Sequence, residues 1–221
     1  MITQAMILAA GHGSRMGALT RSCPKPLLQV GRLRLIEPLL YALANAGIQD
    51  CVINTHQYPE LFDKYLGNGG RYGLCIHYSH EPELLGTGGG VIQALDILQP
   101  EPFLMVSGDI VTDYPFETLL SMPLHRDAHL VMVDNPEQNK LGDFGLDQEN
   151  ILLLDTELKL SYASIGLFHP RLFARYDRGP RSIADILQPA IAQRSISGEY
   201  YQGLRVSVDT PERLASIPTI N

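Results

Sequence analysis

The chain has 221 residues, of which 45% are hydrophobic and 19% charged, a composition that excludes disordered, fibrous and membrane-embedded proteins. Its net charge of −7 argues against a nucleic-acid binder, although a local basic pocket for phosphate groups is compatible with it. Cys23, Cys51 and Cys75 lack a metal-binding spacing such as C-x-x-C, which predicts reduced thiols. The apolar run Ala5–Ala10 is too short for a signal peptide or a membrane span. We therefore expect a cytoplasmic protein that contacts neither nucleic acid nor membrane.

The first half of the chain alternates short apolar runs with segments of helical periodicity. The predicted strands are Ala5–Ala10, Cys51–Asn54, Leu74–Tyr78 and Phe103–Val106. The predicted helices are Leu35–Ala46, Glu60–Leu66 and Gly90–Leu98. This order predicts an α/β fold with a doubly wound, mostly parallel, Rossmann-like sheet and helices on both faces. Such sheets bind ligands at the carboxyl ends of their strands, so we expect functional loops after Ala10, Leu85 and Val106.

The second half is less regular. A strand is expected at Leu130–Val133. A small antiparallel β-rich lobe is expected from Asp143–Leu146, Ile151–Leu154 and Tyr162–Phe168. The remaining predicted elements are a helix at Ile183–Gln193, strands near Tyr200 and Val206, and a short helix from Pro211. Because no repeat or linker divides the chain, one domain over residues 1–221 is predicted, with parts at 1–115 and 116–221.

The segment after the first predicted strand reads L-A-A-G-H-G-S-R-M over residues 8–16 and continues to P-K-P-L over residues 24–27. Glycines in such a turn let backbone N–H groups approach an anion closely. Arg15 and Lys25 supply the positive charge that a triphosphate requires, one as a planar fork and one as a point charge. Taken alone, Gly11 and Gly13 are equally compatible with a simple tight turn.

Two familiar phosphate-binding loops do not fit this segment. A Walker A loop ends in Gly-Lys-Ser/Thr, and the chain has none. A dinucleotide fingerprint needs a third glycine where Met16 stands and an acidic residue where Asn54 stands. The string is similar instead to the signature of the sugar-1-phosphate nucleotidyltransferases, apart from Ala18, where many members have proline.

That resemblance implies roles for individual residues. In the family, the glycine loop and the arginine hold the triphosphate, and the lysine neutralises charge at the reacting phosphate. The residues that would carry these roles here are Ala10, Gly11, Gly13, Arg15 and Lys25.

A second glycine-rich string, L-G-T-G-G-G, covers residues 85–90 between a predicted strand and a predicted helix. Glycine is a poor helix former, so the string suits a backbone against which a flat ring lies. A flexible loop with Thr87 near a helix N-cap is the simpler interpretation. Related enzymes carry L-G-T-G or L-G-T-A where they hold the nucleotide base. The resemblance therefore implies that Gly86 and Thr87 contact the base edge, with Glu81 nearby.

Two aspartates follow predicted strands. Asp109 ends the buried run at 103–106, and Asp209 lies in V-D-T-P-E before the last predicted helix. Each is compatible with a structural cap. Carboxylates at strand ends also suit Mg²⁺, which proteins usually hold by one or two carboxylates together with substrate phosphates. The V-D-T-P-E string resembles that of octulosonate cytidylyltransferases, which implies magnesium at Asp209. The hexose-phosphate enzymes instead place an aspartate where Ser207 stands here.

The resemblance implies that an oxygen of a sugar 1-phosphate attacks the α-phosphorus of a nucleoside triphosphate and releases pyrophosphate. Catalysis would rest on alignment and charge neutralisation by Arg15, Lys25 and Asp109 with Mg²⁺. Several strings, among them S-G-D-I-V-T-D-Y and S-G-E-Y-Y, are similar to the N-acetylmuramate-1-phosphate uridylyltransferases of cell-wall recycling. Residues 1–115 would then bind the nucleotide, and residues 116–221 the sugar, through Gly142 and Asp143. Ala163 stands where many members have a sugar-contacting asparagine.

Two alternatives stay open at this point. A guanylyltransferase for mannose or heptose 1-phosphate would share every phosphate-binding motif. A nucleotide-binding regulatory module without turnover would retain the fold alone. The seven histidines form no i, i+4 pair on a predicted helix and no cysteine joins them, so they are interpreted as solvated or packed side chains. The oligomeric state cannot be predicted from this sequence.

Overall fold

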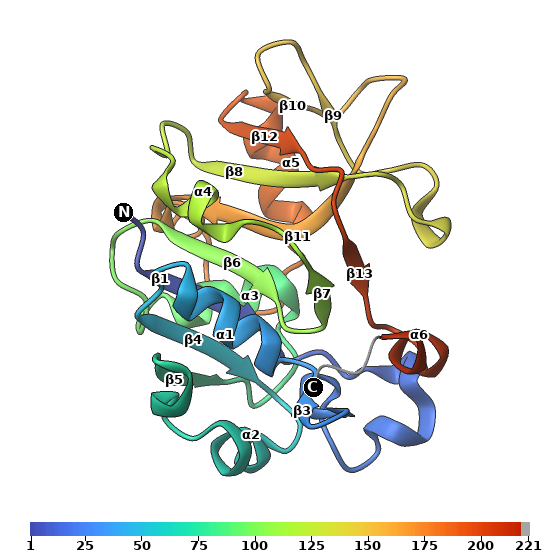
Figure 1. The fold of residues 1–221 in the computed structure, drawn as a ribbon. Coiled ribbons are helices and arrows are strands. Elements are labelled where there is room, and N and C mark those ends of the chain that lie inside the picture. The colour runs from blue at the N-terminus through green and yellow to red at the C-terminus, as the bar shows by residue number, and fades with distance from the viewer. Residues whose placement is uncertain (218–221) are drawn as a thin grey trace.

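The computed structural model describes residues 1–217 and contains a seven-stranded sheet in the order β12-β8-β11-β6-β1-β4-β5 (Figure 1). Its strands are β1 (Gln4–Leu8), β4 (Asp50–Thr55), β5 (Cys75–His80), β6 (Phe103–Ser107), β8 (Ala128–Val133), β11 (Ser161–Phe168) and β12 (Ile196–Tyr200). β5, β4, β1 and β6 are parallel neighbours, as are β8 and β12. β11 alone runs in the opposite direction within this sheet, between β6 and β8. The predicted mostly parallel α/β fold is confirmed.

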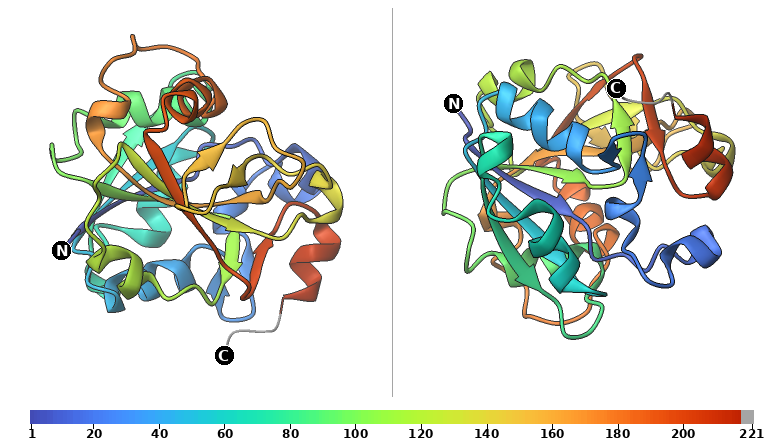
Figure 2. Two further views of the ribbon diagram at one scale, coloured as in Figure 1. Left: turned by 90° about the horizontal axis from the view of Figure 1, so that it is seen from above. Right: turned by 60° about the horizontal axis from the view of Figure 1, so that its bottom comes forward.

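Helices cover both faces of this sheet (Figure 2). The helices α1 (Glu37–Asn45), α2 (Pro59–Leu66) and α4 (Phe116–Ser121) pack on one face, and α3 (Gly86–Ala94) and α5 (Ala184–Ala192) on the other. Side chains alternate along each strand, so a strand buried on both faces contributes to two cores. In β1, Met6 belongs to the core under α3 and Ile7 to the core under α1, and both are fully buried.

Three two-stranded antiparallel sheets accompany the main sheet. They pair β2 (Gln29–Val30) with β3 (Leu33–Arg34), β7 (Ile110–Thr112) with β13 (Arg205–Ser207), and β9 (Gly145–Leu146) with β10 (Leu152–Leu153). The last helix, α6 (Pro211–Ser216), packs against the 3₁₀ segment η1 (Ser14–Thr20). Among the described residues no helix is long and apolar enough to cross a membrane.

The third helix differs from its prediction. It begins at Gly86 and ends at Ala94 instead of covering Gly90–Leu98, so the glycine string forms its first turns. These glycines permit close packing against the segment 179–182. A Cβ atom added to Gly88 would lie 2.7 Å from the carbonyl oxygen of Ser182, and one on Gly89 would lie 2.4 Å from that of Gly179. Tertiary packing therefore overrides the low helix propensity of glycine.

The predicted extent of the antiparallel lobe is also wrong. Of the segments expected in this lobe, β9 and β10 form a separate hairpin, whereas the predicted strand Tyr162–Phe168 is β11, a central strand of the main sheet. Its run Ile165–Phe168 is fully buried, as a strand covered on both faces requires. Strands from both 1–115 and 116–221 share this sheet, and the division at residue 115 stays a prediction.

Candidate active site

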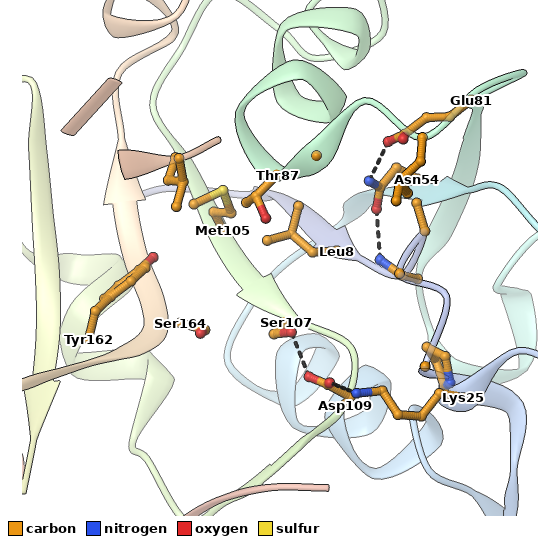
Figure 3. Close-up of a pocket in the computed structure, with 18 residues that line it drawn as sticks. Leu8, Lys25, Asn54, Glu81, Thr87, Met105, Ser107, Asp109, Tyr162 and Ser164 are labelled. Atoms are coloured by element: carbon orange, nitrogen blue, oxygen red, sulfur yellow. Dashed lines mark hydrogen bonds and ion pairs between the residues drawn. The ribbon is translucent and has the colours of Figure 1, made fainter. Parts of the chain in front are cut away.

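A cavity of about 300 Å³ opens at the carboxyl ends of β1 and β6, where parallel α/β sheets bind their ligands (Figure 3). Eight of the predicted site residues line it: Ala10, Gly11, Gly13, Lys25, Glu81, Gly86, Thr87 and Asp109. They come from three separate segments that follow β1, β5 and β6, and Gly86 and Thr87 lie in the first turn of α3. Its other lining residues include Asn54, Ser107, Tyr162 and Ser164. The structure thus brings the loops expected from the sequence to one place.

The loop after β1 is shaped by its two glycines in different ways. Gly13 has a φ of +60°, which disfavours other residues, and its carbonyl oxygen accepts a hydrogen bond from Thr20 Oγ1 at 3.1 Å. Gly11 has no heavy atom within 4 Å of the position that a Cβ would take. The backbone at Gly11 therefore borders open space in the cavity, where an anion could approach it.

Lys25 and Asp109 form an ion pair in the wall of the cavity. Lys25 Nζ contacts Asp109 Oδ2, and Asp109 Oδ1 accepts a hydrogen bond of 2.6 Å from Ser107 Oγ (Figure 3). Both side chains of the pair are mostly buried, with 13% and 16% of their surface exposed. The carboxylate is therefore held at both oxygens. Among residues 1–217, the cation within 4.0 Å of it is Lys25, which is expected to bind phosphate.

Asp209 lies beside the cavity and not among its lining residues. A hydrogen bond of 2.9 Å from the backbone N–H of Val208 to the carbonyl oxygen of Asp109 holds the two aspartate-bearing segments together. Asp209 is 4% exposed. Its Oδ2 pairs with Arg15 at 2.6 Å and its Oδ1 with Arg213 at 2.7 Å. Arg15 likewise lies outside the cavity wall, and its side chain is 66% exposed. It can therefore move toward a ligand without leaving a core.

Glu81 takes part in a buried network that the sequence did not reveal. Asn54 Oδ1 accepts from the backbone N–H of Ala9 at 2.7 Å, and its Nδ2 donates to Glu81 Oε1 at 2.7 Å (Figure 3). Glu81 Oε2 accepts from the backbone N–H of Leu85 at 3.0 Å. Both carboxylate oxygens of Glu81 thus bind protein donors. In this structure Glu81 connects two loops, and its contact with a base stays a prediction.

Gly142 and Asp143 do not line the cavity. Asp143 Oδ2 accepts from the backbone N–H of Tyr162 at 2.8 Å, and Oδ1 accepts from Asn139 Nδ2 at 3.0 Å. Gly142 has a φ of +68° and lies too close to Asn135 for a side chain. Both residues therefore support the start of β11, and their contact with a sugar stays a prediction.

An irregularity in β11 shapes the wall opposite the glycine loop. The register with β8 shifts between Tyr162 and Gly166, and Ser164 has a φ of +59°. As a result Tyr162 and Ser164 both line the cavity, while the side chain of Ala163 is buried in the core. The Tyr162 hydroxyl is buried without a hydrogen-bond partner among residues 1–217. Burial raises the pKa of Tyr162, so this hydroxyl stays protonated at neutral pH.

Arg205 in β13 contacts the same irregular part of β11, although it is not among the residues that line the cavity, and it was missed in the sequence. Its Nε donates to the carbonyl oxygen of Ala163 at 2.9 Å, and its Nη2 lies 3.4 Å from Ser164 Oγ. Burial lowers the pKa of this guanidinium, while the nearby carboxylates of Asp109, Asp209 and Asp143 oppose that shift. Within the described part of the chain it forms no ion pair shorter than 4.0 Å. Only the pairing of β13 with β7 brings it here, and no local motif signals that.

The donor set at Asp109 and Asp209 fits a magnesium ion. Both side chains offer carboxylate oxygens, which hard divalent cations prefer. In this structure the two carboxylates are paired with Lys25, Arg15 and Arg213. A magnesium–triphosphate complex could exchange with these pairs, since it brings a cation for the carboxylates and phosphates for the basic side chains.

Comparison with known proteins agrees with this arrangement. Residues 4–150 match the family model described as "Nucleotidyl transferase". The chain is 39% identical over 219 residues to an N-acetylmuramate alpha-1-phosphate uridylyltransferase from Neisseria meningitidis, covering 96% of this chain and 95% of that protein. It is 32% identical over 203 residues to a mannose-1-phosphate guanylyltransferase catalytic subunit beta from Dictyostelium discoideum, covering 87% of this chain and 56% of that protein's length.

Solved structures share the fold at low sequence identity. A Bacillus anthracis protein described as a glucose-1-phosphate thymidylyltransferase superposes with a TM-score of 0.85 at 19% identity, covering 97% of this chain and 93% of that one. The inositol-1-phosphate CTP transferase from T. maritima gives a TM-score of 0.80 at 17% identity, covering 97% and 92%. These structures show the shared fold. The family match and the near full-length relative show that the chain belongs to the sugar-1-phosphate nucleotidyltransferase family and is an enzyme of nucleotide-sugar biosynthesis.

Proposed function

We propose that this enzyme transfers the uridylyl group of UTP to N-acetylmuramate 1-phosphate, giving UDP-N-acetylmuramate and pyrophosphate. Similarity to the Neisseria meningitidis enzyme over nearly the whole of both chains supports this choice of substrates. The same reaction would return recovered N-acetylmuramate to peptidoglycan synthesis in the cytoplasm.

The observation that carries the choice of sugar is the partly buried guanidinium of Arg205. A cation that is partly removed from water and has no close ion-pair partner gains from a ligand that supplies an anion. N-Acetylmuramate differs from N-acetylglucosamine by a lactyl ether that ends in a carboxylate. We place this carboxylate at Arg205, whose Nη2 lies 3.4 Å from the hydroxyl oxygen of Ser164 in the cavity wall. An N-acetylglucosamine phosphate would leave that guanidinium unpaired.

The phosphate chemistry requires alignment more than proton transfer, because the attacking oxygen of the sugar phosphate is already an anion. That oxygen forms a bond to the α-phosphorus as the bond from this phosphorus to the pyrophosphate oxygen breaks. Lys25 and Arg15 would leave their aspartate partners and bind phosphate oxygens, where charge grows in the transition state. The backbone at Gly11 and Gly13 would hold the remaining phosphates.

Asp109 and Asp209 would hold Mg²⁺, which when bound neutralises the phosphates and helps to orient them. Asp109→Asn is therefore expected to lower kcat by about 10²–10³-fold, the usual effect of removing one electrostatic contact to a transition state. Asp96→Asn is the matched control, because Asp96 pairs with Arg178 at the surface. Pyrophosphate release from UTP, GTP, CTP and dTTP with N-acetylmuramate 1-phosphate measures both the choice of nucleotide and the effect of the Asp109 substitution. A maximum with GTP would replace uridylyl transfer with guanylyl transfer, and an active Asp109→Asn enzyme would refute the mechanism.

Arg205→Gln tests the choice of sugar. Losing one partner of a buried charge pair costs about 2–5 kcal/mol, so kcat/KM for N-acetylmuramate 1-phosphate should fall by about 30-fold or more. The value for N-acetylglucosamine 1-phosphate should change little. Arg178→Gln provides a surface control for the same change. Equal losses with both sugars would show that Arg205 serves the phosphate that they share, and would contradict the assignment to the lactyl carboxylate.

A further inference from the structure

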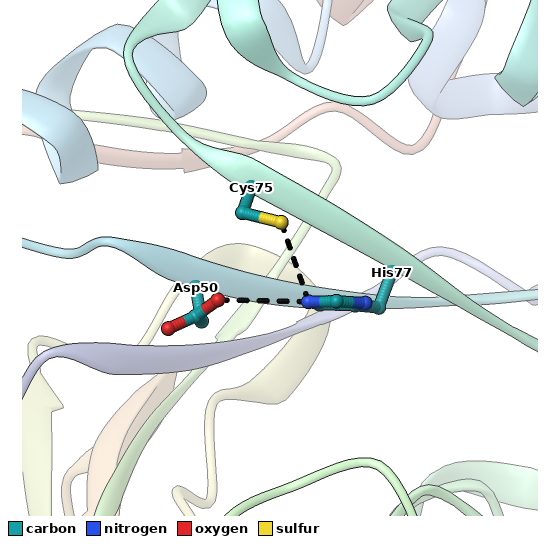
Figure 4. A group of neighbouring side chains, drawn as sticks. All are labelled: Asp50, Cys75 and His77. Atoms are coloured by element: carbon teal, nitrogen blue, oxygen red, sulfur yellow. Dashed lines mark hydrogen bonds and ion pairs between the residues drawn. The ribbon is translucent and has the colours of Figure 1, made fainter.

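A cluster of three side chains lies at the end of the sheet opposite the cavity. It consists of Asp50, Cys75 and His77 (Figure 4). Asp50 begins β4 and Cys75 begins β5, so the cluster lies at the amino ends of strands whose carboxyl ends face the cavity. The expectation that no cysteine joins a histidine is wrong for His77, because Cys75 Sγ lies 3.5 Å from His77 Nε2. The sequence does not reveal this group, because Cys75 and His77 are two residues apart in β5 and Asp50 lies in the neighbouring strand β4.

Strand register explains why the three side chains converge. Asp50 is paired directly with Cys75, and His77 is paired with Val52, two residues along the same face. Side chains at i and i+2 of a strand share a face, and a cross-strand partner lies beside them. The backbone therefore holds one sulfur, one nitrogen and one oxygen donor together. These donor atoms all lie within 4.8 Å of one another.

We propose that Asp50, Cys75 and His77 bind one Zn²⁺ ion. In tetrahedral zinc sites, Zn–S is about 2.3 Å and Zn–N about 2.0–2.1 Å, which separates sulfur and nitrogen ligands by about 3.5 Å and nitrogen and oxygen ligands by about 3.4 Å. The structure gives 3.5 Å for Cys75 Sγ to His77 Nε2 and 3.5 Å for His77 Nε2 to Asp50 Oδ1. Two of the three separations thus match a zinc site without movement of the backbone.

The chemistry of the donors selects zinc over magnesium. Thiolate and imidazole suit borderline-soft cations, whereas Mg²⁺ prefers oxygen ligands only. Cys75 is a free, exposed cysteine, and the side chains of His77 and Asp50 are about half exposed, so an ion can enter from solvent. Water completes the fourth position. Binding converts the thiol to a thiolate and releases its proton.

The placement also gives the ion a structural effect. β5 is the edge strand of the seven-stranded sheet and pairs only with β4 inside it. A metal held by both strands fastens the start of the edge strand to its neighbour. Bound zinc should therefore raise the melting temperature of the wild-type enzyme and leave that of Cys75→Ser unchanged.

Cobalt titration of the metal-free enzyme tests the site, since Co²⁺ reports a thiolate ligand by a charge-transfer band in the near ultraviolet. The proposal predicts a band that saturates at one equivalent and disappears on addition of Zn²⁺. The band should be absent in Cys75→Ser and lost or weakened in His77→Gln. Cys23→Ser and Asp109→Asn are the controls, for the other accessible thiol and for the catalytic metal site, and both should keep it. A wild-type enzyme without the band, or a band at full strength in either ligand variant, would overturn the proposal.

The unmodified chain provides a second test that does not depend on how a variant folds. Zn²⁺ should slow the alkylation of Cys75 by iodoacetamide, measured on its peptide by mass spectrometry, and leave the rate at Cys23 unchanged. Mg²⁺ at the same concentration should protect neither thiol. Equal rates at Cys75 with and without Zn²⁺ would also overturn the proposal. Neither test uses turnover, so the outcome is independent of the substrates proposed above.

Discussion

Asn54 joins the loop after β1 to the segment that precedes α3, and Asn54→Ala is expected to uncouple them. The substitution removes the acceptor of the Ala9 N–H and the donor to Glu81, both at 2.7 Å. Each partner is buried, and leaving a buried polar group unpaired costs about 1–3 kcal/mol. The free energy of unfolding should therefore fall by about 2–6 kcal/mol.

The neighbouring residue offers a matched control. Thr55 is 1% exposed, and its hydroxyl has no hydrogen-bond partner in the part of the chain that the structure describes. Thr55→Val replaces that hydroxyl with a methyl group and should leave stability unchanged or raise it by about 1 kcal/mol. Urea denaturation measures both variants, and pyrophosphate release gives KM for the nucleotide. Asn54→Ala should raise this KM, because the two loops no longer hold one geometry. Equal stabilities for Asn54→Ala and Thr55→Val would refute the reasoning.

Two further predictions concern glycines and pH. Gly11→Ala should keep wild-type stability, because its Cβ would enter open space, and should raise KM for UTP, because that space belongs to the cavity. Gly89→Ala should lower stability, because its Cβ would lie 2.4 Å from a carbonyl oxygen. Thermal melts and KM values separate the two, and a destabilised Gly11→Ala would contradict the first. The imidazole of His129, with Nε2 3.8 Å from Glu199 Oε2, and a hydrogen bond from the Tyr114 hydroxyl hold the pKa of Glu199 below its usual range. The resulting stability is present above the ordinary glutamate pKa of about 4.3 and is lost as pH falls through the lowered folded-state pKa. Glu199→Gln should therefore reduce the loss of unfolding free energy as the pH falls. Urea denaturation at several pH values measures this dependence, and the same dependence in the variant and the wild-type enzyme would contradict the prediction.

The sequence predicts those parts of the site that depend on local strings at strand ends. The glycine turn at Gly11 and Gly13 and the aspartate at Asp109 each follow a buried strand, and parallel strands bring their carboxyl ends to one edge. A short motif was therefore sufficient to place them in the same cavity. Gly88 and Gly89 were harder to interpret, because they are explained by close packing against residues about ninety positions further along the chain.

The opposite wall of the cavity could not be predicted, because it depends on pairing between distant segments. Arg205 arrives through the register of β13 with β7, and Tyr162 and Ser164 share a wall only because β11 is irregular. The sequence also assigned β11 to the small lobe, because a short apolar run does not reveal which strands it pairs with. Long-range pairing thus shapes the side of the site where we propose that the sugar binds.

A competition between two sugars tests the central claim most directly. The wild-type enzyme is given UTP and Mg²⁺ with equal concentrations of N-acetylmuramate 1-phosphate and N-acetylglucosamine 1-phosphate, and the two UDP-sugars are measured early by mass spectrometry. Their ratio equals the ratio of the two kcat/KM values. With Arg205 paired only by the lactyl carboxylate, UDP-N-acetylmuramate should predominate by about a hundredfold or more. Comparable amounts of the two products, or an excess of UDP-N-acetylglucosamine, would contradict the proposed function.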